Sequence, residues 1–122
     1  MGQGSNKMTA STTPTVSEQR LKSRRRVQTY GRVCFFNGTQ FFDCTIYDLT
    51  GSGARIRLSN IQPMPSCVYL INIGDGMAYE AYLVRRDDQE AGLMFVNTLS
   101  LAELTSPELD YLIKLWHDHP NR

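Results

Sequence analysis

After Gly31, apolar and polar residues alternate along most of the chain, and a period of two residues predicts β-strands. In the run QFFDCTIYDL, which spans residues 40–49, Phe42, Cys44 and Ile46 fall on one face. The run ARIRL at residues 54–58 repeats the pattern, with apolar side chains inward and its two arginines outward. We therefore expect strands that bury one face and leave the other in water.

Turn signals separate these runs at short intervals. Asn37 and Gly38 supply the positive φ angles of a tight two-residue hairpin, and the later turns contain GDG and DDQEA. Short connections with no helical crossover favour a mainly β protein, a six-stranded antiparallel barrel over residues 31–97. The expected strands are RVCFF, QFFDCTIYDL, ARIRL, CVYLINI, AYEAYLVRR and LMFV.

One segment, residues 105–118, has the pattern of a C-terminal α-helix. Thr105 or Ser106 can cap it, and Pro107 suits its first turn. Its apolar residues follow the i, i+3, i+4, i+7 spacing of one buried stripe, which packs on the barrel mouth or on another subunit. We favour a lid that closes the open end of the barrel. The stripe consists of Leu109, Leu112, Ile113 and Trp116.

Composition fits one small domain. The chain has 122 residues, of which 41% are apolar, and this is enough for one modest core. Residues 1–19 are rich in Ser, Thr and Gly, so we expect a disordered tail there. Because no apolar run reaches eighteen residues and the first residues lack a signal peptide's apolar stretch, we expect a cytoplasmic protein without a membrane span.

The reactive side chains form no recognisable catalytic or metal-binding set. Cys34, Cys44 and Cys67 form no CxxC pair and lie in strand-like contexts, which predicts reduced thiols in the core. His117 and His119 are two residues apart at the end of the helix, on different faces, and we expect both to be solvated. Since the chain also lacks HExxH, GxSxG and P-loop motifs, we expect neither an enzyme nor a metal protein.

The formal net charge of +1 hides a concentration of positive charge. Six of the 13 basic residues lie between positions 20 and 32, whereas most acidic residues lie beyond position 74. This asymmetry predicts a local anion-binding site. The six residues are Arg20, Lys22, Arg24, Arg25, Arg26 and Arg32.

The stretch YDLTGSGAR, at residues 47–55, has two interpretations. In the first, Asp48 or Thr50 hydrogen-bonds its own backbone in a tight turn. In the second, the two glycines let a flat ligand approach the backbone, while Asp48 offers an acceptor and Thr50 a hydroxyl to its edge. Composition alone favours the first.

Taken together, the two stretches resemble the PilZ family of cyclic di-GMP receptors. An RxxxR pair at Arg20 and Arg24 precedes a D-x-T-x-x-G sequence at Asp48 to Gly53, and the family pattern is RxxxR followed by [D/N]-x-S-x-x-G. The likeness covers roughly residues 20–116, so the domain is expected over 20–122. Thr50 stands where the family usually has Ser, which adds a methyl group. Lys22 and Arg26 form a second possible pair, KxxxR. We prefer Arg20 and Arg24, because their distance from the first strand matches the spacing in the family pattern.

The resemblance implies that cyclic di-GMP is the ligand, with no other cofactor. Arg20 and Arg24 would stack on a guanine or hold a phosphate, and Asp48 would accept hydrogen bonds from the guanine N1–H and N2–H edge. Thr50 would bind the ligand or hold the loop, and Gly53 would keep space clear. Secondary candidates are Arg25, Arg26, Arg55, Arg57 and Ser52. Binding would regulate motility, adhesion or exopolysaccharide production through a protein partner.

The basic segment itself shows no strand pattern between Arg20 and Tyr30, and its cations repel one another. We therefore expect a mobile segment at residues 20–30 that becomes ordered around the ligand and acts as a switch. A second hypothesis is a small barrel that binds single-stranded nucleic acid, with Tyr47, Tyr69 or Tyr79 as stacking platforms. A third is a degenerate PilZ domain that acts only as a protein adaptor.

Overall fold

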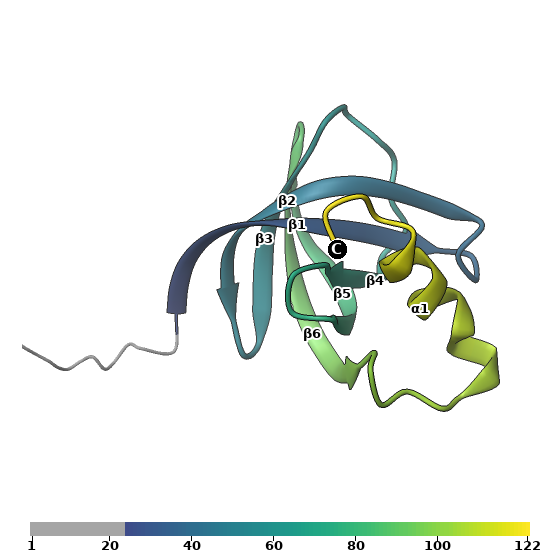
Figure 1. Cartoon of the computed structure of the whole chain (residues 1–122). Coiled ribbons are helices and arrows are strands. Elements are labelled where there is room, and N and C mark those ends of the chain that lie inside the picture. Colours follow the sequence, from purple (N-terminus) through teal and green to yellow (C-terminus); the bar gives the residue numbers. More distant parts are fainter. Residues whose placement is uncertain (1–23) are drawn as a thin grey trace, which may run out of the picture.

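The computed structural model describes residues 24–122, and of residues 24–28 it describes only the backbone. Six antiparallel strands form a closed barrel in the spatial order β1-β2-β3-β6-β5-β4, as Figure 1 shows. The strands are β1 (Arg24–Phe35), β2 (Gln40–Thr50), β3 (Gly53–Leu58), β4 (Cys67–Asn72), β5 (Met77–Asp87) and β6 (Glu90–Ser100). A 3-10 turn, η2 (Pro107–Leu109), leads into the helix α1 (Asp110–His117). The predicted mainly β barrel with a C-terminal helix is confirmed.

The barrel begins earlier than the sequence predicts. Strand β1 starts at Arg24, whereas the expected start was Gly31, so the expectation that residues 24–30 form no strand is wrong. Residues 24–26 pair with residues 50–48 of β2, which supplies hydrogen bonds that local sequence cannot reveal. A register shift between Arg26 and Thr29 interrupts the period of two, and the alternation of apolar and polar residues therefore did not predict this part of the strand. Residues 1–23, including the expected tail, lie outside the described residues.

The inward faces agree with the predicted alternation. Phe42, Cys44 and Ile46 belong to the cluster that fills the barrel, the first of them at its edge. Ala54, Ile56 and Leu58 also point inward and are at most 8% exposed, while the intervening arginines are exposed. A pleated strand with this alternation can pack its apolar face at interior density and hydrate the other.

The first hairpin is longer than the predicted two-residue turn. Its connection has four residues, Phe36 to Thr39, and the amides of Gly38 and Thr39 donate to the carbonyls of Phe35 and Phe36. Asn37 and Gly38 have the predicted positive φ angles, of 57° and 82°. Phe36 also has a positive φ, of 55°, which its side chain does not favour and the sequence did not signal.

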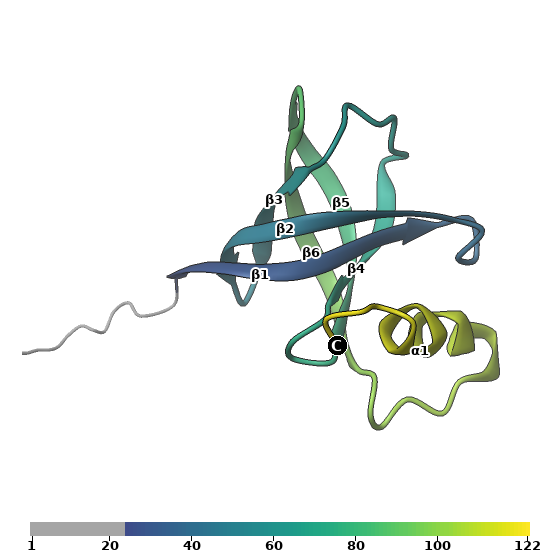
Figure 2. The same cartoon turned by 45° about the horizontal axis from the view of Figure 1, so that its top comes forward.

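Helix α1 packs on the outer wall of the barrel, so the expected lid over the open end is wrong. Leu112 and Leu115 are buried against residues that point outward from the strands, among them Cys34, Ile71 and Ala78. Both views place α1 beside β1 and β4, outside the barrel (Figures 1 and 2). Strand β4 is therefore covered on both faces, which explains its nearly continuous apolar sequence.

Side-chain hydrogen bonds fix the helix to this wall. Arg32 on β1 donates from Nη1 to the carbonyl oxygen of Leu115 at 2.8 Å and from Nε to Asp43 at 2.6 Å. A cation near the last carbonyls of a helix also complements its dipole. Trp116 donates from Nε1 to the carbonyl of Ile73 at 3.0 Å. Within residues 24–122, no helix is long and apolar enough to cross a membrane.

Candidate functional site

The β1–β2 ladder brings the basic segment to the D-x-T-x-x-G sequence. Arg24 is the backbone partner of Thr50, and Arg26 is the partner of Asp48. Two elements that are more than twenty residues apart in the sequence thus share one end of the sheet. Arg20 lies outside the described residues, so the structure places one arginine of the RxxxR pair.

Asp48 lies on the outer face of β2, because its neighbour Leu49 points into the barrel. Only 4% of Asp48 is exposed. Its backbone partner on β3 is Arg55, after a register shift between Ile46 and Asp48 that leaves Tyr47 in a bulge. Sheets use such bulges to redirect a side chain.

Thr50 holds the turn between β2 and β3. Its Oγ1 accepts hydrogen bonds from the backbone amides of Ser52 at 3.1 Å and Gly53 at 3.0 Å. This is a Ser/Thr turn, so the first interpretation of the stretch is confirmed for Thr50. The hydroxyl is the atom that the turn requires, and both Ser and Thr provide it.

Gly53 is required by the packing of β3 on β6. A Cβ atom at this position would collide with the carbonyl oxygen of Leu93. Carbonyl oxygens of a paired strand cannot move aside without breaking the ladder, so a larger residue would separate the two strands locally. Gly53 therefore has a structural role that does not depend on a ligand.

A groove of about 290 Å³ opens on the outer wall beside the turn. Asp48, Thr50 and Ser52 line one side of it, and Arg85 and Gly92 line the other. The remaining lining residues are Gly53, Ala54, Arg55, Val84, Leu93 and Met94. The groove combines one carboxylate, two hydroxyls and two guanidinium groups, a set that can recognise a polar and anionic molecule.

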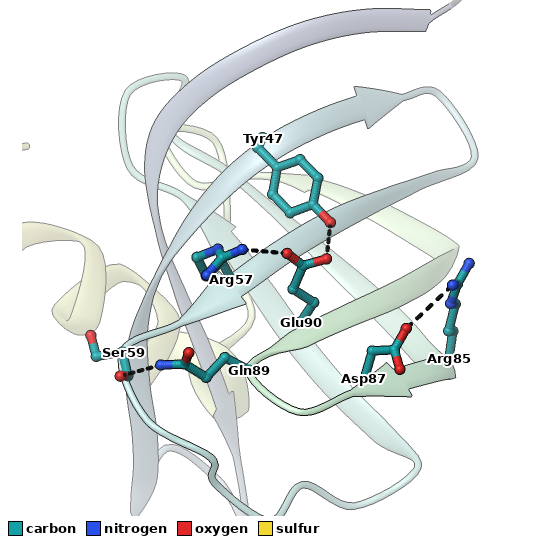
Figure 3. Close-up of polar contacts among 7 residues, drawn as sticks. All are labelled: Tyr47, Arg57, Ser59, Arg85, Asp87, Gln89 and Glu90. Atoms are coloured by element: carbon teal, nitrogen blue, oxygen red, sulfur yellow. Dashed lines mark hydrogen bonds and ion pairs between the residues drawn. The ribbon is translucent and has the colours of Figure 1, made fainter.

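Arg55 and Arg57 were equivalent candidates in the sequence, but they have different surroundings in the structure. Arg55 lines the groove, whereas Arg57 does not. The Nη2 of Arg57 lies 2.5 Å from the Oε2 of Glu90, and the other oxygen of Glu90 accepts a hydrogen bond from Tyr47 (Figure 3). Burial raises the pKa of Tyr47, and its hydrogen bond to Glu90 adds to the effect, so the phenol stays a donor.

Arg85, Gly92, Val84 and Met94 are groove residues that the sequence did not single out. They come from the β5–β6 hairpin, and their position beside Arg55 depends on the β3–β6 register. Strand pairing between distant segments has no signal in a single sequence. The alternation of apolar and polar residues in β6 could at most have shown that Gly92 lies on the outer face.

Several side chains differ from their expected exposure. Cys67 is exposed, although Cys34 and Cys44 are buried as predicted. His119 is only 6% exposed, because the chain turns back after α1 and brings it near Asp43, while His117 is exposed as expected. Burial is the main cause that lowers the pKa of His119 below its ordinary value, so the ring stays neutral and its Nδ1 accepts from the amide of Asn121.

The aromatic residues proposed as stacking platforms for nucleic acid differ in their burial. Tyr79 is 9% exposed and stacks on Phe95, with ring centroids 4.1 Å apart. Tyr69 packs in the cluster beneath α1, and Tyr47 donates to Glu90. Tyr79 therefore has no free ring face for a base, whereas Tyr47 and Tyr69 are half-buried, and the nucleic-acid hypothesis stays a prediction.

Comparison with known proteins identifies the fold. No protein-family model matches the chain, and no curated protein matches it. Among solved structures, the chain is similar to the "Crystal structure of PilZ domain of CeSA from cellulose synthesizing bacterium", with a TM-score of 0.51. The superposition covers 77% of this chain and 94% of the other, at 16% sequence identity. The chain therefore has a PilZ-like fold.

Proposed function

We propose that the chain binds cyclic di-GMP on the outer wall of the barrel, where the start of β1 meets the β2–β3 turn. The backbone register is the observation that supports this proposal best. It brings Arg24 opposite Thr50 and Arg26 opposite Asp48, so the two halves of the ligand-binding pattern meet at one end of the sheet. The PilZ-like fold supports the same interpretation.

The residue types at this place suit the ligand. Arginine presents a planar fork that can stack on a guanine or hold a phosphate through two parallel hydrogen bonds, and Arg20 and Arg24 would have this role. The carboxylate of Asp48 would accept from the N1–H and N2–H edge of guanine, a pair of donors that adenine lacks. The selectivity of the site for guanine would therefore depend on Asp48.

The proposed biological role is that of a switch. Cyclic di-GMP would stabilise the start of β1 against β2, and a protein partner would recognise the resulting surface. Control of motility, adhesion or exopolysaccharide production would follow from that partner. The adaptor hypothesis predicts the same partner without any ligand.

Isothermal titration of cyclic di-GMP into the wild-type chain, Arg24→Ala and Asp48→Asn tests the proposal. We expect micromolar or tighter binding by the wild type, and a loss of about five- to 150-fold in each variant, since a bidentate contact contributes ~1–3 kcal/mol. Arg122→Ala is the matched control, because it removes the same charge beside Trp116, away from the groove.

The specificity arms of the titration use GTP and cyclic di-AMP. We expect wild-type affinity for cyclic di-GMP to exceed that for cyclic di-AMP, and Asp48→Asn to reduce the difference. A wild-type chain that binds no cyclic dinucleotide would contradict the proposal and favour the adaptor. Equal losses in Arg24→Ala and Arg122→Ala would show a general charge effect instead of a site.

A further inference from the structure

One row of residues crosses the outer wall of the barrel at the level of Asp48. Arg26 on β1 pairs with Asp48 on β2, which pairs with Arg55 on β3. Arg55 pairs with Gly92 on β6, and Gly92 pairs with Arg85 on β5. The row extends the candidate site by two strands beyond the D-x-T-x-x-G sequence, to a residue that belongs to neither part of the ligand-binding pattern.

Gly92 leaves a gap between two arginines in this row. A Cβ atom there would lie 3.3 Å from the Cβ of Arg85 and 3.8 Å from Cγ2 of Val84, so a side chain would fill the space beside Arg85. Neighbouring strands are about 4.8 Å apart, which puts the backbones of Arg55 and Arg85 about 10 Å apart across the glycine. Two arginine side chains can span that distance and meet above the backbone of Gly92.

Both arginine side chains are exposed in this position, and Arg55 also contacts the phenol of Tyr47. Arg55 and Arg85 are exposed and line the same groove as Gly92. Arg85 lies 3.3 Å from Asp87, but both side chains are mostly exposed, at 63% and 68%, and such surface pairs are weak. Figure 3 shows two separate ion pairs on this face, Arg57 with Glu90 and Arg85 with Asp87.

We propose that Arg55 and Arg85 form an anion-binding pair that holds a phosphodiester group of the ligand above Gly92. The inference rests on the proposed function and names a residue, Arg85, that the sequence pattern omits. Two planar forks that approach one phosphate from opposite sides satisfy its oxygens better than a single cation, and the glycine lets the phosphate approach the sheet.

The test measures the affinity of cyclic di-GMP for Arg55→Gln, Arg85→Gln and the matched control Arg57→Gln. All three variants lose one positive charge, and Arg57 lies on the same face of β3 as Arg55 but outside the groove. We expect the first two to weaken binding at least about fivefold, and Arg57→Gln to change it less than about twofold. Arg85→Lys should recover only part of the affinity, because lysine keeps the charge without the fork.

The double variant Arg55→Gln/Arg85→Gln tests whether the two side chains act together. If they hold one phosphate, the combined loss should be smaller than the product of the two single losses, because the first substitution already removes part of the contact. A combined loss equal to that product would show two separate contacts and contradict the pair. Urea unfolding of each variant checks that the fold is kept.

The outcomes separate this inference from the proposed function. If the wild type binds and Arg85→Gln binds equally well, the pair is wrong while the proposed function stands. If the wild type does not bind cyclic di-GMP, the proposed function is wrong, and NMR titration with inorganic pyrophosphate then decides on the pair. A chemical-shift change of the Gly92 amide in the wild type that is absent in Arg85→Gln would support an anion-binding pair without the proposed function. No change in the wild type would overturn the pair.

Discussion

The two residues at the centre of the site, Thr50 and Gly53, act first on the backbone. Thr50 accepts two amide hydrogen bonds within its own turn, and Gly53 allows β3 to approach Leu93. A sequence pattern that includes both residues therefore partly specifies the β2–β3 turn. This turn sets the positions of Asp48 and Arg55. Such residues control ligand binding through geometry, whether or not they touch the ligand.

Thr50→Ser and Thr50→Val separate the hydroxyl of Thr50 from its methyl group. Serine keeps the acceptor for both amides, so we expect unchanged stability and an affinity for cyclic di-GMP within about twofold of wild type. Valine has nearly the same shape without the acceptor, and we expect a loss of ~1 kcal/mol in the free energy of unfolding, measured in urea, together with weaker binding. If Thr50→Val matched the wild type in both, the turn would not need this hydroxyl.

Individual side chains were predictable where a local pattern decides their environment. The inward positions in β2 and β3, Cys44 among them, follow from alternation alone, whereas Cys34 faces outward and is buried beneath α1. The burial of His119 was not predictable, because it depends on the chain turning back toward Asp43 after the helix ends. Contacts between segments that are distant in sequence carry no periodic signal.

At the scale of elements, strand β1 has two differently supported halves. Its middle, Gly31 to Cys34, pairs with β2 on one side and with β4 on the other. Its first residues, 24–26, pair with β2, and the β4 ladder does not extend to them. The sequence did not predict the first half, because a register shift and three consecutive arginines, Arg24 to Arg26, interrupt the alternation of apolar and polar residues.

This difference gives an expectation for hydrogen exchange followed by mass spectrometry. In the free protein, amides of residues 24–29 should exchange faster than those of residues 31–34, because pairing on one edge gives less protection. Cyclic di-GMP should slow exchange in residues 24–29 and leave residues 31–34 unchanged. Equal exchange with and without saturating ligand in residues 24–29 would contradict a switch at β1. Arg24→Ala with the same ligand concentration is the control.

The whole molecule has two apolar layers that share the strands. One fills the barrel and includes Cys44, and the other lies between the outer wall and α1 and includes Cys34. The sequence contained a signal for the second layer, since β4 is apolar on both faces and must be covered twice. The signal did not say which element covers it, so the position of α1 could be learned only from the fold.

The three cysteines can report on these layers separately. Cys67 is exposed, whereas burial raises the pKa of both Cys34 and Cys44 to about 12. Thiolates are the reactive form, so the two buried thiols should react only after an opening that exposes them. Cys34 needs α1 to detach, and Cys44 needs the barrel to open.

We expect thiol labelling in increasing urea to modify Cys67 first, Cys34 second and Cys44 last. An isolated helix of eight residues is unstable in water, so α1 should detach at a lower free-energy cost than the closed barrel needs to open. Labelling at pH 8, with each site quantified by mass spectrometry, gives the two opening free energies. Trp116→Phe, which removes the hydrogen bond to Ile73, should accelerate the labelling of Cys34 and leave that of Cys44 unchanged. Simultaneous labelling of Cys34 and Cys44 in both proteins would mean that helix and barrel unfold as one cooperative unit, and that movement of α1 alone is not available to a switch.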